Sequence, residues 1–389
     1  MQKQIFLKKN EHRRVIAGHP WVFSNEIRET KGSPDPGDIV ELLAASGLSL
    51  GIGFFNPHSL ISFRLLSNRI EEIDFNFFYA RISQALELRK CLYPDSTVYR
   101  VVYGESDFLP GLVIDRFNDL LAVQTFSYGM DQRLAIICDA LEAIFHPTGI
   151  VERNESPLRL LEKLPQQKKV LRGTSSPIII TENDIRYRVD ILEGQKTGFF
   201  LDQRENRKSI ERFSRGASAL DCFCNEGGFA LSAIRGGATF VMGIDSSESA
   251  IQRAIENATL NNMKNVVFER ADVFEKLKEL LAQGRSFDVV VLDPPSFTRS
   301  KKNVQTAKKG YKDLHAAALG LLKRGGTLLT ASCSHHIESE VFLSIVNETA
   351  LKAGRALQLL DWRGAAPDHP VLPGMPETRY LKFGIFKVL

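Results

Sequence analysis

The chain has few cysteines and no long apolar run. Its five cysteines, spread irregularly over 389 residues, do not form a disulfide framework, so we expect a reduced, cytoplasmic protein. No stretch reaches the roughly 18 apolar residues of a membrane-spanning helix, which argues against a membrane partner. The first residues, Met1 to Leu7, are followed at once by charges and lack the apolar region of a signal peptide.

The sequence also lacks internal repeats, low-complexity segments and a strong charge of either sign. Fifty Lys and Arg residues against 46 Asp and Glu residues leave a net charge of +4, which permits nucleic acid binding without requiring it. A hydrophobic content of 43% and a charged content of 25% are typical of a soluble globular protein. A chain of 389 residues is too long for one ordinary core, so two or three domains are expected.

Three regions differ in their secondary-structure pattern. Residues 1–70 contain short strand-like runs separated by turn residues, which predicts a small antiparallel β-barrel. Residues 71–185 combine strand-like runs with helices over about Glu72 to Lys90 and Asp131 to Phe145, which predicts a small α+β domain. Residues 186–389 alternate strands with helices, which predicts a doubly wound α/β sheet whose ligands bind beyond the carboxyl ends of its strands.

Acidic residues end four successive predicted strands of the last region. They are Asp221, Asp245, Asp272 and Asp293. The turn after Asp221 contains Gly227-Gly228 but not the Gly-x-Gly-x-x-Gly spacing of a dinucleotide fold; paired glycines can also serve strand–helix packing alone. Asp245 is placed to accept hydrogen bonds from ribose hydroxyls, and Asp272 to contact an adenine amino group. This pattern favours S-adenosylmethionine over NAD.

A thiol and a carboxylate end two further apolar runs. Cys333 follows Gly326 to Thr330, and Asp293 follows Phe287 to Leu292 directly before Pro294-Pro295. If the two runs are neighbouring parallel strands, both side chains lie at one edge of the sheet and face one cleft, an arrangement suited to covalent chemistry. The alternative is that Cys333 is a small buried packing residue at the end of a strand.

Two other groups of residues resemble metal ligands only superficially. Cys222 and Cys224 form a Cys-x-Cys pair without a second pair, and the adjacent His335 and His336 lack a suitably spaced fourth ligand. We therefore predict no metal.

Basic residues gather in three clusters. Any one cluster is typical of a solvated surface. The third follows the Asp-Pro-Pro segment and so flanks the predicted site. The clusters are Lys8, Lys9, Arg13 and Arg14; Lys168, Lys169 and Arg172; and Arg299, Lys301, Lys302, Lys308, Lys309 and Lys312.

An ordered set of motifs resembles one family, the bacterial 23S ribosomal RNA 5-methylcytosine methyltransferases that carry an N-terminal PUA domain. The likeness runs nearly from end to end. The motifs are Gly18 to Phe23, Gly104 to Asp115, Lys196 to Arg204, Asp221 to Phe229, Asp293 to Pro295, Ser332 to His336, Asp368 to Pro370 and Pro376 to Lys382.

The resemblance implies a PUA domain, a central α+β domain and a class I methyltransferase domain. It implies S-adenosylmethionine as methyl donor and 23S ribosomal RNA or the pre-50S subunit as partner; the oligomeric state, including a homodimer, stays open. Two residues depart from the family pattern: Glu226 replaces a small hydroxyl residue and Ser296 a lysine or alanine. The donor-binding residues implied are Gln203, Arg204, Asp221, Phe223, Gly227, Gly228, Asp245, Ser246, Asp272 and Asp293.

Cytosine C5 is a poor nucleophile, so its methylation requires covalent activation. Cys333 is our candidate to add to C6, and Asp293 would hold or protonate N3; the base that removes the C5 proton is not identified. The target base must leave its stack. We expect the lysine-rich loop from Thr298 to Tyr311 to contact phosphates. Tyr311 or Phe297 is a candidate to stack on a base, and packing is the favoured role for Phe297. The expected RNA-binding residues are Lys8, Lys9, Arg13, Arg14, Arg299, Lys301, Lys302, Lys308 and Lys309.

Two other functions stay open. An RNA nitrogen methyltransferase acting on guanine or adenine would use the Asp-Pro-Pro segment without a covalent adduct. A catalytically inactive RNA-binding protein would keep the same fold, although the acidic strand ends and Cys333 argue against loss of catalysis.

Overall fold

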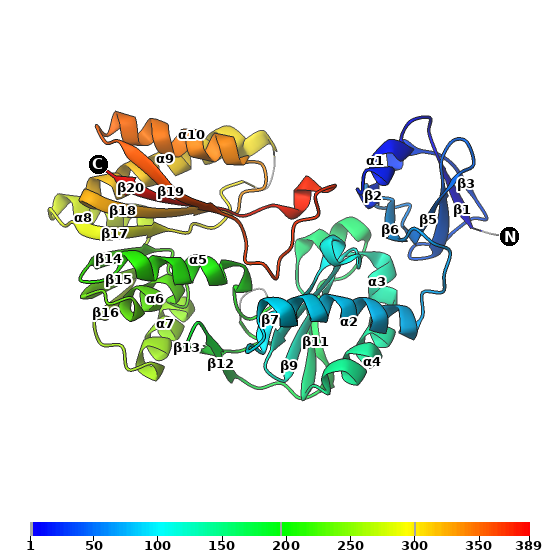
Figure 1. Cartoon of the computed structure of the whole chain (residues 1–389), viewed down its shortest axis with the longest axis horizontal. Helices are drawn as coiled ribbons and strands as arrows, with labels where there is room; N and C mark the ends of the chain where they lie inside the picture. Colours follow the sequence, from blue (N-terminus) through cyan, green and yellow to red (C-terminus); the bar gives the residue numbers. More distant parts are fainter. Residues whose placement is uncertain (1–2, 195–196, 299–300) are drawn as a thin grey trace. The chain divides into compact units, whose positions relative to one another are not determined.

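The computed structural model describes residues 3–194, 197–298 and 301–389. The chain forms two compact units, shown in Figure 1. The first contains Met1–Ile180, Val189–Leu201 and Pro367–Thr378, and the second contains Thr181–Arg188, Asp202–Ala366 and Arg379–Leu389. The chain therefore passes between the units several times.

The N-terminal part of the first unit is a six-stranded sheet in the order β2-β6-β5-β4-β1-β3. Its core includes Ile5, Val40 and Phe63, all fully buried. The sheet is mixed and not wholly antiparallel as expected, because β1 pairs in parallel with β4. The elements are β1 (Gln4–Leu7), α1 (His12–Ile16), β2 (Trp21–Val22), β3 (Ile27–Lys31), β4 (Ile39–Leu43), β5 (Ser49–Phe55) and β6 (Phe63–Ser67).

The rest of the first unit is built on a five-stranded sheet in the order β11-β10-β9-β8-β7. The helix expected over Asp131 to Phe145 is two helices, because the backbone at Arg133 (φ −102°, ψ 10°) interrupts it. The elements are α2 (Phe75–Leu92), β7 (Val98–Tyr103), β8 (Leu112–Phe117), β9 (Leu120–Thr125), α3 (Tyr128–Gln132), α4 (Leu134–Phe145), β10 (Gly149–Asn154) and β11 (Gln167–Gly173).

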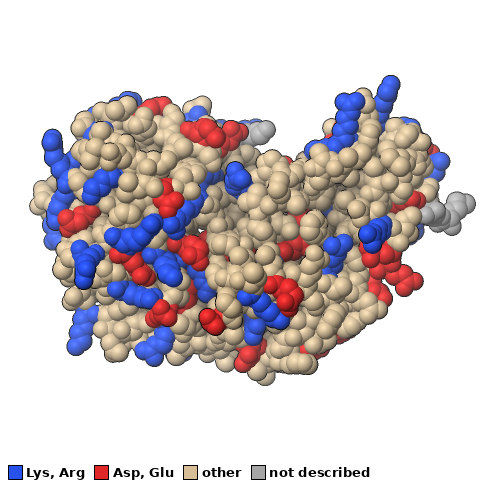
Figure 2. Space-filling view, viewed as in Figure 1, with Lys and Arg blue, Asp and Glu red and all other residues tan. Residues whose placement is uncertain are grey.

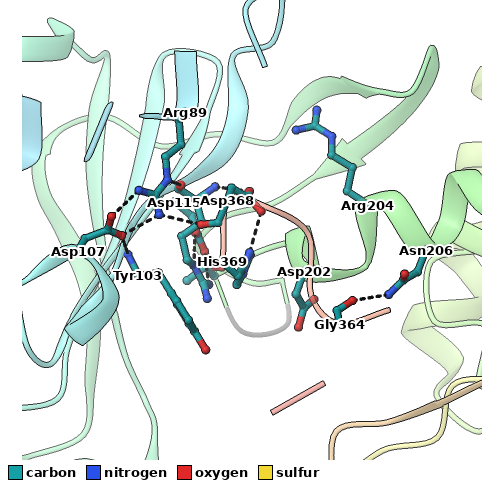
Figure 3. A network of polar contacts seen from close by, with 12 residues as sticks. Arg89, Tyr103, Asp107, Asp115, Asp202, Arg204, Asn206, Gly364, Asp368 and His369 are labelled. Carbon is teal, nitrogen blue, oxygen red and sulfur yellow. Dashed lines mark hydrogen bonds and ion pairs between the residues drawn. The ribbon is translucent and has the colours of Figure 1, made fainter. Parts of the chain in front are cut away.

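A buried ionic network fixes Pro367–Thr378, a segment late in the chain, within this first unit. Arg89 contacts both carboxylate oxygens of Asp107, at 2.5 and 2.7 Å, and donates to the carbonyl of Asp368 at 2.8 Å, as Figure 3 shows. The Asp368 carboxylate accepts from the Arg100 amide at 2.9 Å and bonds to His369 Nδ1 at 2.8 Å. Because these charges are buried and paired, breaking one pair would leave an uncompensated charge. The residues before and after this segment belong to the second unit.

The second unit is a seven-stranded sheet in the order β16-β15-β14-β17-β18-β20-β19. The neighbours from β16 to β18 are parallel, whereas β20 runs antiparallel to both β18 and β19. The chain order reverses beside β14, where such sheets bind ligands at the carboxyl ends. The strands are β14 (Ser218–Cys222), β15 (Phe240–Asp245), β16 (Val266–Arg270), β17 (Phe287–Leu292), β18 (Leu322–Ser332), β19 (Leu357–Arg363) and β20 (Lys382–Val388); β12 (Ile178–Glu182) and β13 (Ile185–Val189) form a separate pair.

Helices cover both faces of the seven-stranded sheet. Figure 1 shows α9 and α10 on one side and α6 and α7 on the other. The fold class predicted from the alternation of strands and helices is confirmed. The helices are α5 (Arg204–Ser209), α6 (Gly228–Arg235), α7 (Glu248–Leu260), α8 (Val273–Ala282), α9 (Val304–Leu321) and α10 (Ser339–Lys352).

The prediction of a loop from Thr298 to Tyr311 is wrong, because helix α9 begins at Val304. Ala307, Tyr311 and Leu314 recur at helical spacing and are buried against the sheet. Gly310 lies inside the helix, where a Cβ would come within 3.3 Å of the Phe297 ring. Tyr311 is therefore a core residue and does not stack on a base.

Within the described ranges no helix has both the length and the apolar character needed to cross a membrane.

Candidate active site

Three of the four predicted acidic residues lie at the carboxyl edge of the sheet as expected. Asp221 lies near the end of β14, Asp245 ends β15, and Asp293 directly follows β17. Asp272 lies two residues beyond β16 and is exposed; its Oδ1 accepts a 3.1 Å hydrogen bond from the Glu275 amide and caps α8. Asp272 thus has a structural role that the sequence pattern alone did not indicate.

Asp221 is the most constrained of these carboxylates. It is 1% exposed, and its Oδ2 accepts a 2.9 Å hydrogen bond from the Ala230 amide at the start of α6. Its Oδ1 has no hydrogen-bond partner among the described residues. Burial raises the pKa of Asp221 well above its usual value, and the nearby Asp293 and Asp245 carboxylates raise it further. An unpartnered oxygen among carboxylates suits a ligand that brings a positive charge or a donor.

The turn after β14 is fixed by backbone contacts to Asp245. The Asn225 amide donates to Asp245 Oδ2 at 3.0 Å, and the Ser247 amide donates to Oδ1 at 2.9 Å. Gly227 has φ +84°, and a Cβ there would meet the Phe268 ring at 2.8 Å. A Cβ at Gly228 would meet Arg207 Cδ at 2.4 Å. Close packing therefore accounts for both glycines, whether or not a ligand approaches them.

Glu226, which departs from the family pattern, turns towards α7. Its Oε1 accepts a 2.7 Å hydrogen bond from Arg253 Nε, and the side chain is buried. Burial raises the pKa of Glu226 to about 7, while the charge of Arg253 opposes that shift. In the same turn Phe223 is half-buried with φ +63°. Ser246 follows β15 and is exposed.

Gln203 and Arg204, which the resemblance implies bind the methyl donor, have different surroundings. Gln203 is 4% exposed; its Nε2 donates to Asp293 Oδ2 at 3.0 Å, and its Oε1 accepts from Asn206 Nδ2 at 2.7 Å. Arg204 is buried, with its Nε 3.8 Å from Glu182 Oε2. Gln203 thus lies at the predicted site, whereas the Arg204 guanidinium forms an ion pair inside the second unit.

Cys333 and Asp293 follow neighbouring parallel strands. Leu292 of β17 is in register with Thr330 of β18, so both residues follow the same end of the sheet. The Cys333 side chain is half-buried, and its Sγ lies 3.9 Å from the Pro294 carbonyl oxygen of the Asp-Pro-Pro segment. The thiol therefore lies beside that segment.

Ser334 links the Cys333 segment to two other elements. Its Oγ accepts a 3.2 Å hydrogen bond from the Phe297 amide and lies 3.3 Å from Ser296 Oγ. It also lies 3.0 Å from the Tyr311 hydroxyl, which donates to Ser332 Oγ at 2.9 Å. Burial raises the pKa of Tyr311 to about 12, so the phenol stays neutral. The sequence indicates no separate role for Ser334 beyond its place beside Cys333 in the motif from Ser332 to His336.

Other cysteines and histidines do not resemble a metal site. Burial raises the pKa of both Cys222 and Cys224, which favours the thiol over the metal-binding thiolate. Over residues 3–194, 197–298 and 301–389, no group of three His, Cys, Asp or Glu side chains is arranged to hold a metal ion.

The basic residues expected to bind RNA have unequal exposure. Lys9, Arg13, Lys302 and Lys309 are exposed, whereas Lys308 is half-buried. Lys8 Nζ donates to the Asn25 carbonyl at 2.7 Å. Figure 2 shows lysine and arginine side chains interspersed with acidic ones on the visible surface. Arg299 lies outside the described residues, as does the side chain of Lys301.

Arg14 differs from the other members of its cluster. Its guanidinium contacts Glu26 Oε2 at 2.7 Å and the Trp21 carbonyl at 3.1 Å, and it lies 4.7 Å from the centre of the Phe23 ring. Because these contacts occupy the Arg14 guanidinium, Arg14 is a weaker candidate for RNA binding than Lys9 or Arg13.

Comparison with known proteins assigns the chain to one family. Residues 5–68 match a PUA-like domain, and residues 171–382 match an S-adenosylmethionine-dependent methyltransferase domain. The ribosomal RNA large subunit methyltransferase I of Tolumonas auensis is 40% identical over 98% of both chains. The chain belongs to the ribosomal RNA large subunit methyltransferase I family. Its relative from Pseudoalteromonas translucida is 39% identical over 100% of both chains.

Solved structures support the fold of this methyltransferase. A SAM-dependent methyltransferase from Streptococcus mutans has a TM-score of 0.85 with 20% identity and covers 100% of both chains. A methyltransferase solved in complex with SAH has a TM-score of 0.86 with 21% identity over the same coverage. At these identities the likeness extends to the fold alone.

This family member is an S-adenosylmethionine-dependent methyltransferase, and the observed residues fit that donor. The unpartnered Oδ1 of the buried Asp221 can accept a hydrogen bond from the donor's amino group. Asp245, with its carboxylate fixed by two backbone amides, lies at the end of the next strand, where ribose hydroxyls can reach it. The expected donor is thus confirmed at the level of the family, and the individual contacts stay predictions.

Proposed function

We propose that this enzyme methylates large-subunit ribosomal RNA, either as 23S RNA or in the pre-50S subunit, at C5 of a cytosine. The names of its relatives support the substrate class. The observation that carries the choice of atom is the thiol of Cys333 beside the Asp-Pro-Pro segment, with Asp293 on the adjacent strand end. We place the reaction in the cytoplasm. The division into domains at residues 70 and 185 is part of the same proposal.

The proposed chemistry begins at Cys333. Its thiolate adds to C6 of the cytosine, forming an S–C6 bond and moving electron density to C5. Asp293, oriented by Gln203, donates a proton or a hydrogen bond from its carboxyl group to N3 as negative charge develops there. S-adenosylmethionine, when bound, supplies an electrophilic methyl group on its sulfonium. Once C5 has taken this methyl group, with the donor's sulfur leaving as a neutral thioether, a base removes the C5 proton, the S–C6 bond breaks, and Cys333 leaves as a thiolate.

Surface lysines near the site are suited to RNA phosphates. A hollow of about 530 Å³ between α9 and α10 is lined in part by Lys308, Lys309, Lys312 and Lys352. Lys312 pairs with Glu348 at 2.9 Å, and the charge of Lys352 also acts on Glu348, whereas Lys308 and Lys309 form no ion pair among the described residues. We propose that they contact the RNA backbone and that Lys8, Lys9 and Arg13 do so on the first unit.

Identifying the methylated nucleoside tests this function. The enzyme is incubated with unmodified large-subunit RNA and a donor carrying a labelled methyl group, and the RNA is digested for mass spectrometry. We expect 5-methylcytidine from the wild type and none from Cys333→Ala, which should still bind the donor by calorimetry. Cys91→Ala, at an exposed cysteine, is the matched control and should stay active. A methylated guanosine or adenosine, or an active Cys333→Ala variant, contradicts the covalent route.

The covalent bond can also be detected directly. RNA containing 5-fluorocytosine has no proton at C5 to remove, so the S–C6 bond should persist. We expect an adduct that survives denaturing electrophoresis with the wild type and Cys91→Ala but not with Cys333→Ala. A protein without catalysis would form no adduct and would still bind RNA.

A further inference from the structure

Lys382 is a buried cation that has no carboxylate partner among the residues the structure describes. Its side chain is 4% exposed, and Nζ donates 2.8 Å hydrogen bonds to the carbonyls of Ser334 and Tyr380. No ion pair joins it to an acidic residue among those described. Lysine is rarely buried unless it is paired, because moving an ammonium out of water is costly. Two carbonyl oxygens offset only part of that cost and leave one N–H of the ammonium without a described acceptor.

Strand pairing places this ammonium against the Cys333 segment. Lys382 begins β20 and is in register with Ser332 on β18. Its Nζ donates to the carbonyl of Ser334. Lys382 therefore pairs in register with the residue before Cys333, and its ammonium donates to the residue after Cys333. Burial lowers the pKa of Lys382 to about 8, while the charge of Cys333 raises it. At neutral pH most of the population keeps the ammonium.

The other charged or titratable groups around Cys333 would not favour a thiolate. Asp293, after β17, is a carboxylate at the same edge of the sheet. Tyr311 of α9 is a buried neutral phenol that is sensitive to the charges of both Cys333 and Asp293. His335 is exposed and His336 is half-buried, so solvent screens both. Among the described groups packed against the segment, Lys382 supplies a buried positive charge.

We propose that Lys382 is a positioning residue that stabilises the thiolate of Cys333 and holds its segment through the Ser334 carbonyl. The thiol proton passes to solvent, and the ammonium keeps its own protons. This role rests on the proposed covalent function, because only attack by sulfur at C6 requires a thiolate.

Alkylation of Cys333 tests the proposal without RNA or donor. In a Cys91→Ser background, iodoacetamide labelling of Cys333 is followed by mass spectrometry between pH 6 and 10. The matched variants are Lys382→Met, which keeps the length and removes the charge, Lys382→Arg, which restores the charge, and Lys387→Met on the same strand. We expect Lys382→Met to slow labelling at pH 7 about tenfold, as for roughly one unit of change in thiol ionisation. Lys382→Arg should recover most of the rate, and Lys387→Met should leave it unchanged.

The parent protein gives a test that does not depend on the folding of a variant. Its labelling rate should reach half its maximum below the ordinary thiol value of about 8.5. A midpoint at or above that value, or equal labelling of the parent and a folded Lys382→Met, overturns the proposal.

Methyl transfer separates this proposal from the proposed function. In Lys382→Met we expect kcat to fall, to recover as the pH rises, and KM for RNA to stay unchanged; a merely structural loss would not recover with pH. If Lys382→Met slows labelling but the wild type makes a nitrogen-methylated nucleoside, the proposed function fails while the effect of Lys382 on the thiol stands. If 5-methylcytidine forms but labelling is insensitive to Lys382, this inference alone fails.

Discussion

Gln203 donates a 3.0 Å hydrogen bond from Nε2 to Oδ2 of Asp293. Gln203 is itself held by Asn206 of α5 and is nearly fully buried. The amide can therefore fix the direction of a carboxylate whose proposed task is to hold the base at N3. Because the contact joins the start of α5 to the end of β17, it depends on the tertiary structure.

The first prediction concerns this contact. Gln203→Leu should lower kcat roughly fivefold, because Asp293 loses an orienting hydrogen bond worth about 1 kcal/mol. Steady-state methylation of RNA measures the effect. Gln252→Leu, at an exposed glutamine of α7, is the control. An unchanged kcat in a folded Gln203→Leu variant would show that the hydrogen bond does not matter for the reaction.

The second prediction concerns Asp221. Its raised folded-state pKa means that its contribution to stability is fully present below the unfolded value of 3.8 and is lost as the pH rises through the folded value. Asp221→Asn should therefore raise the melting temperature of the ligand-free protein at pH 8. It should also weaken donor binding at least about tenfold, because the amino group loses a charged acceptor. Thermal melts with and without donor give both results, and undiminished donor affinity would count against the assigned contact.

The third prediction concerns His315, which is fully buried between the Tyr311 carbonyl and Thr330 Oγ1. Burial lowers the pKa of His315 from 6.5 to about 4. The stability that the neutral imidazole contributes is present above pH 6.5 and is lost as the pH falls towards 4, by about 3 kcal/mol. Urea unfolding at pH 7.5 and pH 5 should show about 2 kcal/mol of this loss, because pH 5 still lies above the folded pKa.

His315→Gln should show a smaller difference between the two pH values than the wild type does. His58→Gln, at an exposed histidine, should behave like the wild type. Equal pH dependence in all three proteins would remove His315 as the cause.

The fourth prediction concerns Lys308 and Lys309 on α9. Replacing both with Gln should weaken RNA binding and reduce the slope of log K against log salt by roughly 1 to 2, because each phosphate contact releases counterions. Donor binding should not change. Lys278→Gln, at a lysine already paired with Glu275 at 2.8 Å, is the control. If the double variant keeps the wild-type slope, this surface does not contact the RNA backbone.

The sequence determined much of the second unit because its strands and helices alternate with clear periodicity. Asp245 ends β15 as predicted, and the adjacency of the runs ending at Asp293 and Thr330 is confirmed as β17 beside β18. Parallel strands place their carboxyl ends at one edge of the sheet. The order of strands along the sequence was therefore sufficient to predict that the side chains at those ends lie together. The family resemblance added the donor and the substrate class.

One error was avoidable from the sequence. The lysines around Gly310 suggested a loop, yet Ala307, Tyr311, Leu314 and Ala318 already had helical spacing. The charged and apolar residues of α9 alternate within the same short segment. The lysines therefore drew attention away from the helical spacing of the apolar residues.

Only the tertiary structure decided which residues surround Cys333. Lys382 lies 49 positions later in the chain and reaches the site because β20 inserts antiparallel between β18 and β19. Ser334, Tyr311 and Gln203 acquire their partners in the same way, through contacts that no local pattern records. Periodicity specifies which face of an element is apolar, whereas pairing between distant segments sets where a buried charge or hydrogen bond acts.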